Sequence, residues 1–95
     1  MIKSFASKDT EAVFRGEFVK KLPRDMQVSA YTKLLMLDSI KEIKELQLRP
    51  ALNCEKLKGR LAHLWSIRIN KQWRVCFEWN EEVAEATSVQ IADYH

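Results

Sequence analysis

Cationic side chains are concentrated in residues 57–79, LKGRLAHLWSIRINKQWRVCFEW, a segment that otherwise alternates apolar and polar residues as a half-buried sheet does. A sheet has no structural need for these charges, which are carried by Lys58, Arg60, Arg68, Lys71 and Arg74. Arginine and lysine are suited to phosphate, because guanidinium presents a planar fork and ammonium a point charge. The segment therefore indicates a phosphate-binding surface on the predicted sheet.

The last three residues are also suited to chemistry, since Asp93, Tyr94 and His95 can all donate or accept protons. Cleavage of RNA by its own 2′-hydroxyl needs a base for the hydroxyl proton, an acid for the leaving oxygen and cations for the charge that develops on the phosphate. Glu55 can share the proton transfers. This reaction requires no metal or cofactor, and no spacing of ligand-type residues suggests a metal site.

The same residues have ordinary structural interpretations. A terminal histidine is more often disordered than catalytic, and Asp93 and Tyr94 can instead fasten the last strand by hydrogen bonds. His63 stands alone and is expected to be a turn or strand residue. The three tryptophans can stack on bases, but core packing is favoured for Trp65 and Trp73.

The composition describes one small domain over residues 1–95. With 95 residues, 46% of them hydrophobic, the chain can bury one modest core. Its 16 Lys and Arg against 13 Asp and Glu give a net charge of +3, which fits a polyanionic partner without requiring one. Cys54 and Cys76 are too few for a disulfide framework or a zinc site, and we expect small buried thiols. No segment resembles a signal peptide or a membrane helix, so we expect a cytoplasmic protein with no membrane partner.

Two helices are predicted in the first half of the chain. Ser7 or Asp9 can cap a short helix that runs to about Val19, and Pro23 separates it from a longer helix over residues 24–46. In the longer helix the apolar residues recur at spacings of three and four: Met26, Ala30, Leu34, Leu37, Ile40 and Ile43. This pattern predicts an apolar stripe that packs on a sheet. Three further residues are expected to broaden the stripe into one wide packed face: Tyr31, Leu35 and Met36.

A β-hairpin with a three-residue loop at residues 70–72 gives the most consistent register. This loop pairs Ile69 with Trp73, Ile67 with Val75 and Trp65 with Phe77, which places six large apolar side chains on one face. A two-residue loop would scramble that face, because a one-residue slip inverts the side chains of one strand.

The same register places Arg68 opposite Arg74, and Ser66 opposite Cys76, on the reverse face. Two like charges opposed across a strand pair destabilise the sheet by about 0.2 to 1 kcal/mol. We therefore expect an anion to offset them, either Glu78 or a bound phosphate.

The predicted fold class is α+β. Residues 2–5 can form an opening edge strand and residues 83–91 a last strand. The two N-terminal helices would pack on one face of a mainly antiparallel sheet of about four to five strands. The other face would stay open and present Lys58, Arg68 and Arg74.

An ordered set of short motifs resembles the HigB-type toxins of the RelE superfamily: IKSF at residues 2–5, LKG at 57–59, WSIRIN at 65–70, QWRV at 72–75 and DYH at 93–95. The resemblance spans essentially the whole chain and implies a RelE-like fold. It implies a toxin of a bacterial type II toxin–antitoxin pair, a ribosome-dependent endoribonuclease that cuts messenger RNA during translation and arrests growth. The implied partner is a HigA-type antitoxin with a helix-turn-helix domain. The toxin would bind operator DNA only as part of the complex with this antitoxin.

The resemblance also implies roles for individual residues. Lys58 and Arg74 would hold the scissile phosphate, and His95 with Asp93 would transfer protons. Some members place a histidine three residues before the lysine of LKG, where this chain has Glu55, whose carboxylate can still accept a proton. Four more residues are expected to support substrate binding: Lys56, Arg68, Lys71 and Tyr94. The alternative is a non-catalytic adaptor that binds RNA or a protein through the basic sheet face.

Overall fold

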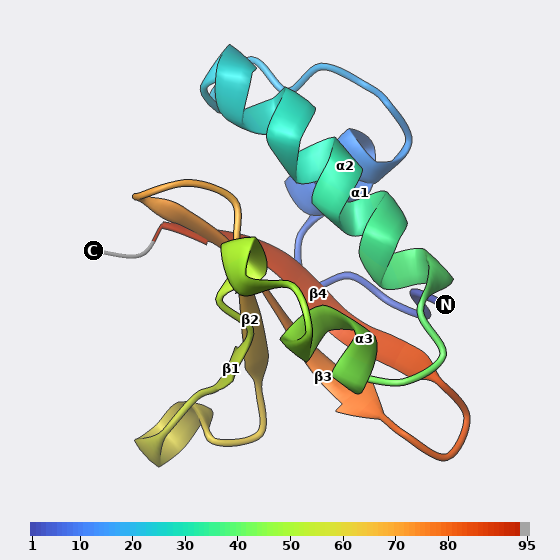
Figure 1. Ribbon diagram of the computed structural model, residues 1–95. Helices are drawn as coiled ribbons and strands as arrows, with labels where there is room; N and C mark the ends of the chain where they lie inside the picture. The colour runs from blue at the N-terminus through green and yellow to red at the C-terminus, as the bar shows by residue number, and fades with distance from the viewer. Residues whose placement is uncertain (94–95) are drawn as a thin grey trace.

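A single antiparallel sheet with strand order β1-β2-β3-β4 organises the chain. The computed structural model describes residues 1–93, and Figure 1 shows their arrangement. The strands are β1 (Glu55–Lys56), β2 (Trp65–Arg68), β3 (Trp73–Asn80) and β4 (Glu85–Asp93). The predicted opening strand lies beside β4, where Ile2 and Phe5 form isolated parallel bridges to Ala86 and Val89.

The predicted hairpin register is confirmed. Trp65 pairs with Phe77, and Arg68 pairs with Arg74. The loop holds this register because Asn70 Oδ1 accepts hydrogen bonds from the backbone N–H groups of Gln72 and Trp73, each at 2.9 Å. An asparagine side chain that binds the backbone two residues on is a common way to stabilise a turn.

Helix α1 (Lys8–Phe14) begins at the predicted cap and ends earlier than predicted. Ser7 Oγ accepts a hydrogen bond from the Thr10 N–H at 3.2 Å. The prediction that the helix reaches Val19 is wrong, because Gly16 adopts φ +82°, a left-handed conformation that stops a helix.

Helix α2 (Arg24–Ser39) also ends before its predicted limit at residue 46, because Ile40 is extended and buried in the core. The Lys41 and Glu42 N–H groups donate to Glu45 Oε2 at 2.7 and 2.8 Å instead of continuing the helix. These bonds from Glu42 and Lys41 hold the pKa of the Glu45 carboxyl below its usual value. A short helix, α3 (Lys44–Gln47), follows.

The core lies between the helices and one face of the sheet. Figure 1 shows α1 and α2 together on the same side, where α2 contacts β3 and β4 and α1 contacts β4. Only one stripe of α2 is packed against the sheet: Met26, Ala30, Leu34 and Leu37, each at most 2% exposed. The prediction that Tyr31 and Leu35 broaden this stripe is wrong, since they are 39% and 44% exposed, whereas the third residue, Met36, is partly buried against the core.

Two short 3-10 helices flank β1 in the sequence. The first, η1 (Pro50–Leu52), contacts β2, and the second, η2 (Gly59–Leu61), lies between β1 and β2. In the described part of the chain, no helix is long and apolar enough to cross a membrane.

Candidate active site

Arg74 is buried on the sheet face away from α1 and α2, with 5% of its surface exposed. It alternates along β3 with Val75, which faces the core. Its guanidinium is held at two points, because Nε donates to Ser66 Oγ at 2.9 Å and Nη2 donates to the Asn53 carbonyl oxygen at 2.6 Å. The side chain therefore presents a fixed positive charge.

The backbone at Asn53 is shaped to receive this arginine. Asn53 ends η1 in the left-handed region, at φ 44°, a conformation that asparagine tolerates better than most residues. The turn that starts at Pro50 thereby brings the Asn53 carbonyl oxygen to the guanidinium.

Glu55 is an anion beside one of the two opposed arginines, Arg74. Its Oε1 lies 3.8 Å from Arg74 Nη2, and its side chain is 48% exposed. Glu78 does not have the predicted role, because its carboxylate accepts a hydrogen bond from Ser88 Oγ at 3.0 Å. Among residues 1–93, no ion pair joins Glu78 to Arg68 or Arg74.

The predicted cations, except Arg60, line two hollows. A hollow of about 220 Å³ is lined by Arg68, Lys71 and Arg74 together with Asn53 and Asn70. We call it the arginine hollow. It brings together three predicted site residues from both strands and the loop of the hairpin.

A second hollow, of about 420 Å³, is lined by Glu55, Lys56 and Lys58 together with Leu57 and Leu61. We call it the lysine hollow. Lys56 Nζ lies 5.4 Å from the centre of the Trp65 ring, a cation–π distance. The Arg74–Glu55 contact links the two hollows, since each residue lines one of them.

Asp93 lines neither hollow. It pairs with Trp73, so by strand alternation it belongs to the other face from Arg74. Its Oδ2 accepts a hydrogen bond from Gln72 Nε2 at 3.1 Å. Tyr94 and His95 lie outside the described residues, so their predicted roles remain predictions.

The two cysteines are free, and burial suppresses their ionisation. Burial raises the pKa of the half-buried Cys54 thiol to about 11, although the charge of Arg74 acts in the opposite direction. Burial likewise raises the pKa of Cys76. Both are thiols at neutral pH and poor nucleophiles. Residues 1–93 contain no group of three or more metal-ligating side chains.

Two groups that hold Arg74 were not singled out from the sequence. The hairpin register already places Ser66 on the Arg74 face, so its hydroxyl could have been identified as a partner. Nothing in the sequence indicates that the Asn53 carbonyl oxygen binds Arg74, because the direction of this oxygen depends on a left-handed backbone conformation after η1.

A two-helix layer on one face of a small antiparallel sheet, with an arginine held in place on the other face, is the arrangement of a RelE-like domain. A family model described as the RelE-like toxin of type II toxin-antitoxin system HigB matches residues 3–95. The chain belongs to this family of HigB-like toxins. As a type II toxin it has a cognate antitoxin as its partner.

Two curated relatives agree with this assignment. The chain is 35% identical over 73 residues to Toxin HigB-1 of Vibrio cholerae, with 77% of each chain covered. It is 30% identical over 95 residues to Endoribonuclease HigB of Proteus vulgaris, with all of both chains covered.

Proposed function

We propose that this toxin is an endoribonuclease that cleaves messenger RNA on the ribosome and thereby arrests growth. The observation that carries the proposal is the Arg74 guanidinium, held by Ser66 and Asn53 beside a cationic hollow. The relative from Proteus vulgaris, which carries the name endoribonuclease, matches the chain over its full length. The held guanidinium and the name of this relative both support cleavage of a phosphodiester bond.

In the proposed reaction, the 2′-oxygen of a nucleotide attacks the adjacent phosphorus as its proton passes to a base. The P–O bond to the 5′-oxygen of the next nucleotide breaks, and that oxygen takes a proton from an acid. The products are a 2′,3′-cyclic phosphate and a 5′-hydroxyl. Charge develops on the non-bridging oxygens, where a fixed guanidinium stabilises the transition state more than the ground state.

The described residues divide these tasks. Arg74 faces the phosphate, while Arg68 and Lys71 hold neighbouring phosphates from the arginine hollow. Lys56 and Lys58 extend the cationic surface in the lysine hollow. Glu55 is our proposed proton acceptor, because its half-exposed carboxylate lies beside Arg74. From the family resemblance, His95 remains a proposed proton-transfer residue. Asp93 keeps this proposed role through the resemblance alone, because strand alternation puts it on the other sheet face from Arg74.

The ribosome would align the substrate for this small site. Holding the 2′-oxygen in line with the leaving oxygen removes a large part of the activation barrier. The two hollows are exposed and do not enclose a substrate by themselves. We therefore place the reaction on translating ribosomes in the cytoplasm. We propose a HigA-type helix-turn-helix antitoxin as the partner, with operator DNA bound only by the complex.

A translation extract separates this enzyme from the non-catalytic adaptor. Purified wild-type toxin is expected to produce discrete messenger cuts with 5′-hydroxyl ends in the extract, mapped by primer extension. The same messenger without ribosomes serves as the control and is expected to stay intact. Toxin that cosediments with ribosomes and leaves the message uncut would establish the adaptor.

Ser66→Ala tests whether the orientation of Arg74 matters. The change removes the acceptor for Arg74 Nε from a fully buried site and leaves the arginine less constrained. We expect kcat to fall by about tenfold with a smaller change in KM, since misplaced catalytic groups lose transition-state stabilisation.

Ser66→Thr is the matched control, because it keeps the hydroxyl on the strand. It is expected to retain most of the wild-type kcat. Equal losses in the two variants, or an unchanged kcat in Ser66→Ala, would show that this hydrogen bond has no role in positioning Arg74.

A further inference from the structure

Helix α2 carries a second apolar stripe that the fold does not bury. Val28, Tyr31 and Leu35 follow one another at spacings of three and four, and they are 68%, 39% and 44% exposed. This stripe lies on the other side of the helix from the buried stripe defined by Met26 and Leu34. Because the buried stripe already anchors α2 on the sheet, the exposed stripe is not part of the core packing.

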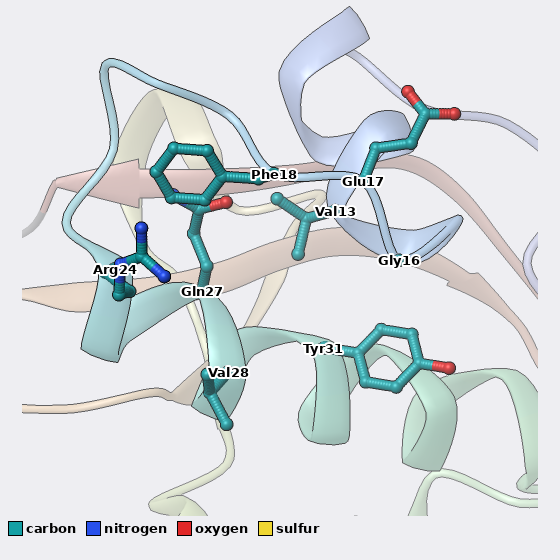
Figure 2. A pocket seen from close by; sticks show the side chains of 8 residues that line it. All are labelled: Val13, Gly16, Glu17, Phe18, Arg24, Gln27, Val28 and Tyr31. Carbon is teal, nitrogen blue, oxygen red and sulfur yellow. The ribbon is translucent and has the colours of Figure 1, made fainter.

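The exposed stripe borders a groove of about 460 Å³ between the end of α1 and the start of α2. Figure 2 shows the side chains that line it, including Phe18 from the connecting loop and Val28 and Tyr31 from α2. Phe18 is 57% exposed. Exposed apolar side chains that cluster around a groove are typical of protein interaction sites.

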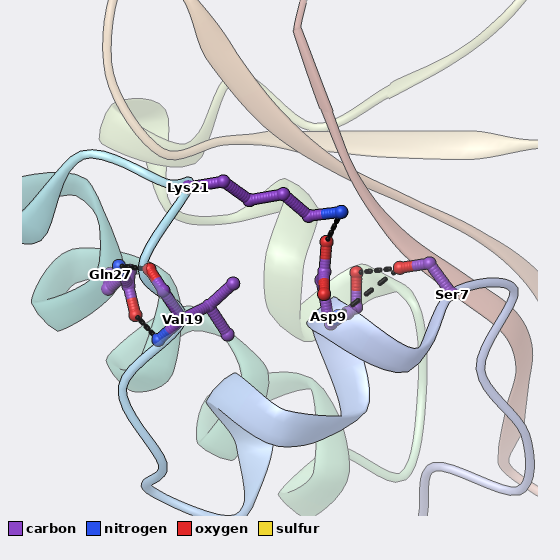
Figure 3. Close-up of polar contacts among 6 residues, drawn as sticks. Ser7, Asp9, Val19, Lys21 and Gln27 are labelled. Carbon is purple, nitrogen blue, oxygen red and sulfur yellow. Dashed lines mark hydrogen bonds and ion pairs between the residues drawn. The ribbon is translucent and has the colours of Figure 1, made fainter.

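The loop that forms one wall of the groove is fixed in place. Gln27, 7% exposed, donates from Nε2 to the carbonyl oxygens of Val19 and Leu22 at 2.7 and 2.8 Å. Its Oε1 accepts from the Val19 N–H at 2.8 Å. Lys21 Nζ also pairs with Asp9 Oδ2 at 3.2 Å, as Figure 3 shows. A preformed groove avoids the entropy cost of ordering a loop when a partner binds.

The cations around the groove that the described chain leaves unpaired favour an acidic partner, because Glu17, the carboxylate that lines it, already pairs with Arg15 at 3.6 Å. The Arg24 guanidinium lies 4.9 Å from the centre of the Phe18 ring, at the groove. Within residues 1–93, Arg24 and the exposed Lys20 form no ion pair, whereas Arg15 and Lys21 are paired with carboxylates. A carboxylate next to apolar side chains would therefore complement this surface.

We propose that this groove binds an amphipathic segment of the cognate antitoxin, with apolar side chains against Phe18, Val28 and Tyr31 and a carboxylate on Arg24. A type II toxin must bind its antitoxin, and this is the largest of the hollows described above. No residue lines both this groove and the arginine or lysine hollow. The segment therefore holds the toxin without covering Arg74.

The test measures the Kd between purified toxin variants and the protein that neutralises wild-type toxin when co-expressed. Val28→Glu places a carboxylate on the apolar side of the groove, and we expect it to weaken binding by about thirtyfold or more, as for a central interface residue. Leu48→Glu is the matched control, because Leu48 is equally exposed, at 70%, and does not line the groove. It is expected to bind as the wild type does.

Growth arrest by Val28→Glu should persist and should resist neutralisation, which shows that the variant folds. Arg74→Ala should bind the antitoxin with unchanged Kd. This binding measurement does not depend on RNA cleavage, so it stays informative if the proposed nuclease activity is wrong. Unchanged affinity in Val28→Glu, or an equal loss in Arg74→Ala, would overturn the proposal. So would sedimentation showing that wild-type toxin dimerises through this groove and that Val28→Glu is a monomer.

Discussion

Arg74→Ala is expected to lower the rate of messenger RNA cleavage by about two to three orders of magnitude, the loss typical when one fixed donor to a developing oxyanion is removed. The physical reason is the two-point attachment to Ser66 and Asn53, which aims the guanidinium before substrate arrives. The readouts are growth arrest on expression and primer extension in a translation extract. We expect Arg74→Ala to lose both growth arrest and messenger cleavage.

Arg74→Lys is expected to be nearly as inactive, although it keeps the positive charge. An ammonium cannot reproduce the planar fork that donates from Nε and Nη2 in fixed directions. Full activity in the lysine variant would show that only charge matters at this position.

Arg68→Ala is the matched control for Arg74→Ala, because the two arginines are paired across β2 and β3. Arg68 is exposed, so we expect its loss to weaken substrate binding several-fold and to leave kcat nearly unchanged. Thermal unfolding must accompany these assays, since removal of Arg74 leaves the buried Ser66 hydroxyl without this donor. Growth arrest and cleavage that both survive Arg74→Ala would show that the active site is elsewhere.

Phe77→Ala is expected to cost about 3 to 5 kcal/mol of the free energy of unfolding, as for other fully buried aromatic residues. Phe77 is 0% exposed, on β3 in the core. A domain of this size has a total stability of only about 5 to 15 kcal/mol. The variant should therefore lose a large share of its stability, measured as a lower urea midpoint.

Phe18→Ala provides the same chemical change at a site that is 57% exposed. We expect its free energy of unfolding to stay within about 0.5 kcal/mol of the wild type, as for most surface substitutions. It should nevertheless weaken antitoxin binding, because Phe18 lines the groove. Similar urea midpoints for the two alanine variants would show that Phe77 is not the core residue described here.

The hairpin was predictable because its apolar side chains constrain the register. Only the three-residue loop places Ile67, Val75 and Phe77 on one face, and these residues are fully buried in the structure. The same register also predicts that Arg68 and Arg74 lie together on the reverse face, as they do in the structure. Strand alternation thus predicts which side chains share a face.

The ends of the helices were less predictable, because local contacts decide them. Apolar spacing continues past Ser39, yet Ile40 leaves the helix and Glu45 binds the freed N–H groups. In α2 the exposed stripe and the buried stripe have similar spacing, so sequence alone merged them into one packed face. Which stripe meets the sheet depends on the tertiary arrangement.

The site was predicted as a set of cations but not as an arrangement. Glu55 was expected to be a base, and its position beside Arg74 adds a role as counter-ion. Lys58 was expected at the same phosphate as Arg74, whereas the two residues line separate hollows. The positions of Glu55 and Lys58 depend on how residues 50–61 fold. The sequence of this segment has no periodic pattern from which that fold could be predicted.

The most direct test of the central claim is single-turnover cleavage of messenger RNA on programmed ribosomes, at saturating concentrations of Arg74→Ala toxin. If Arg74 stabilises the charge that develops on the phosphate, the cleavage rate constant at saturation falls by about a hundredfold or more, while the half-saturating toxin concentration changes little. A wild-type rate constant at saturation, with only a higher half-saturating concentration, would contradict the claim and reduce Arg74 to a binding residue.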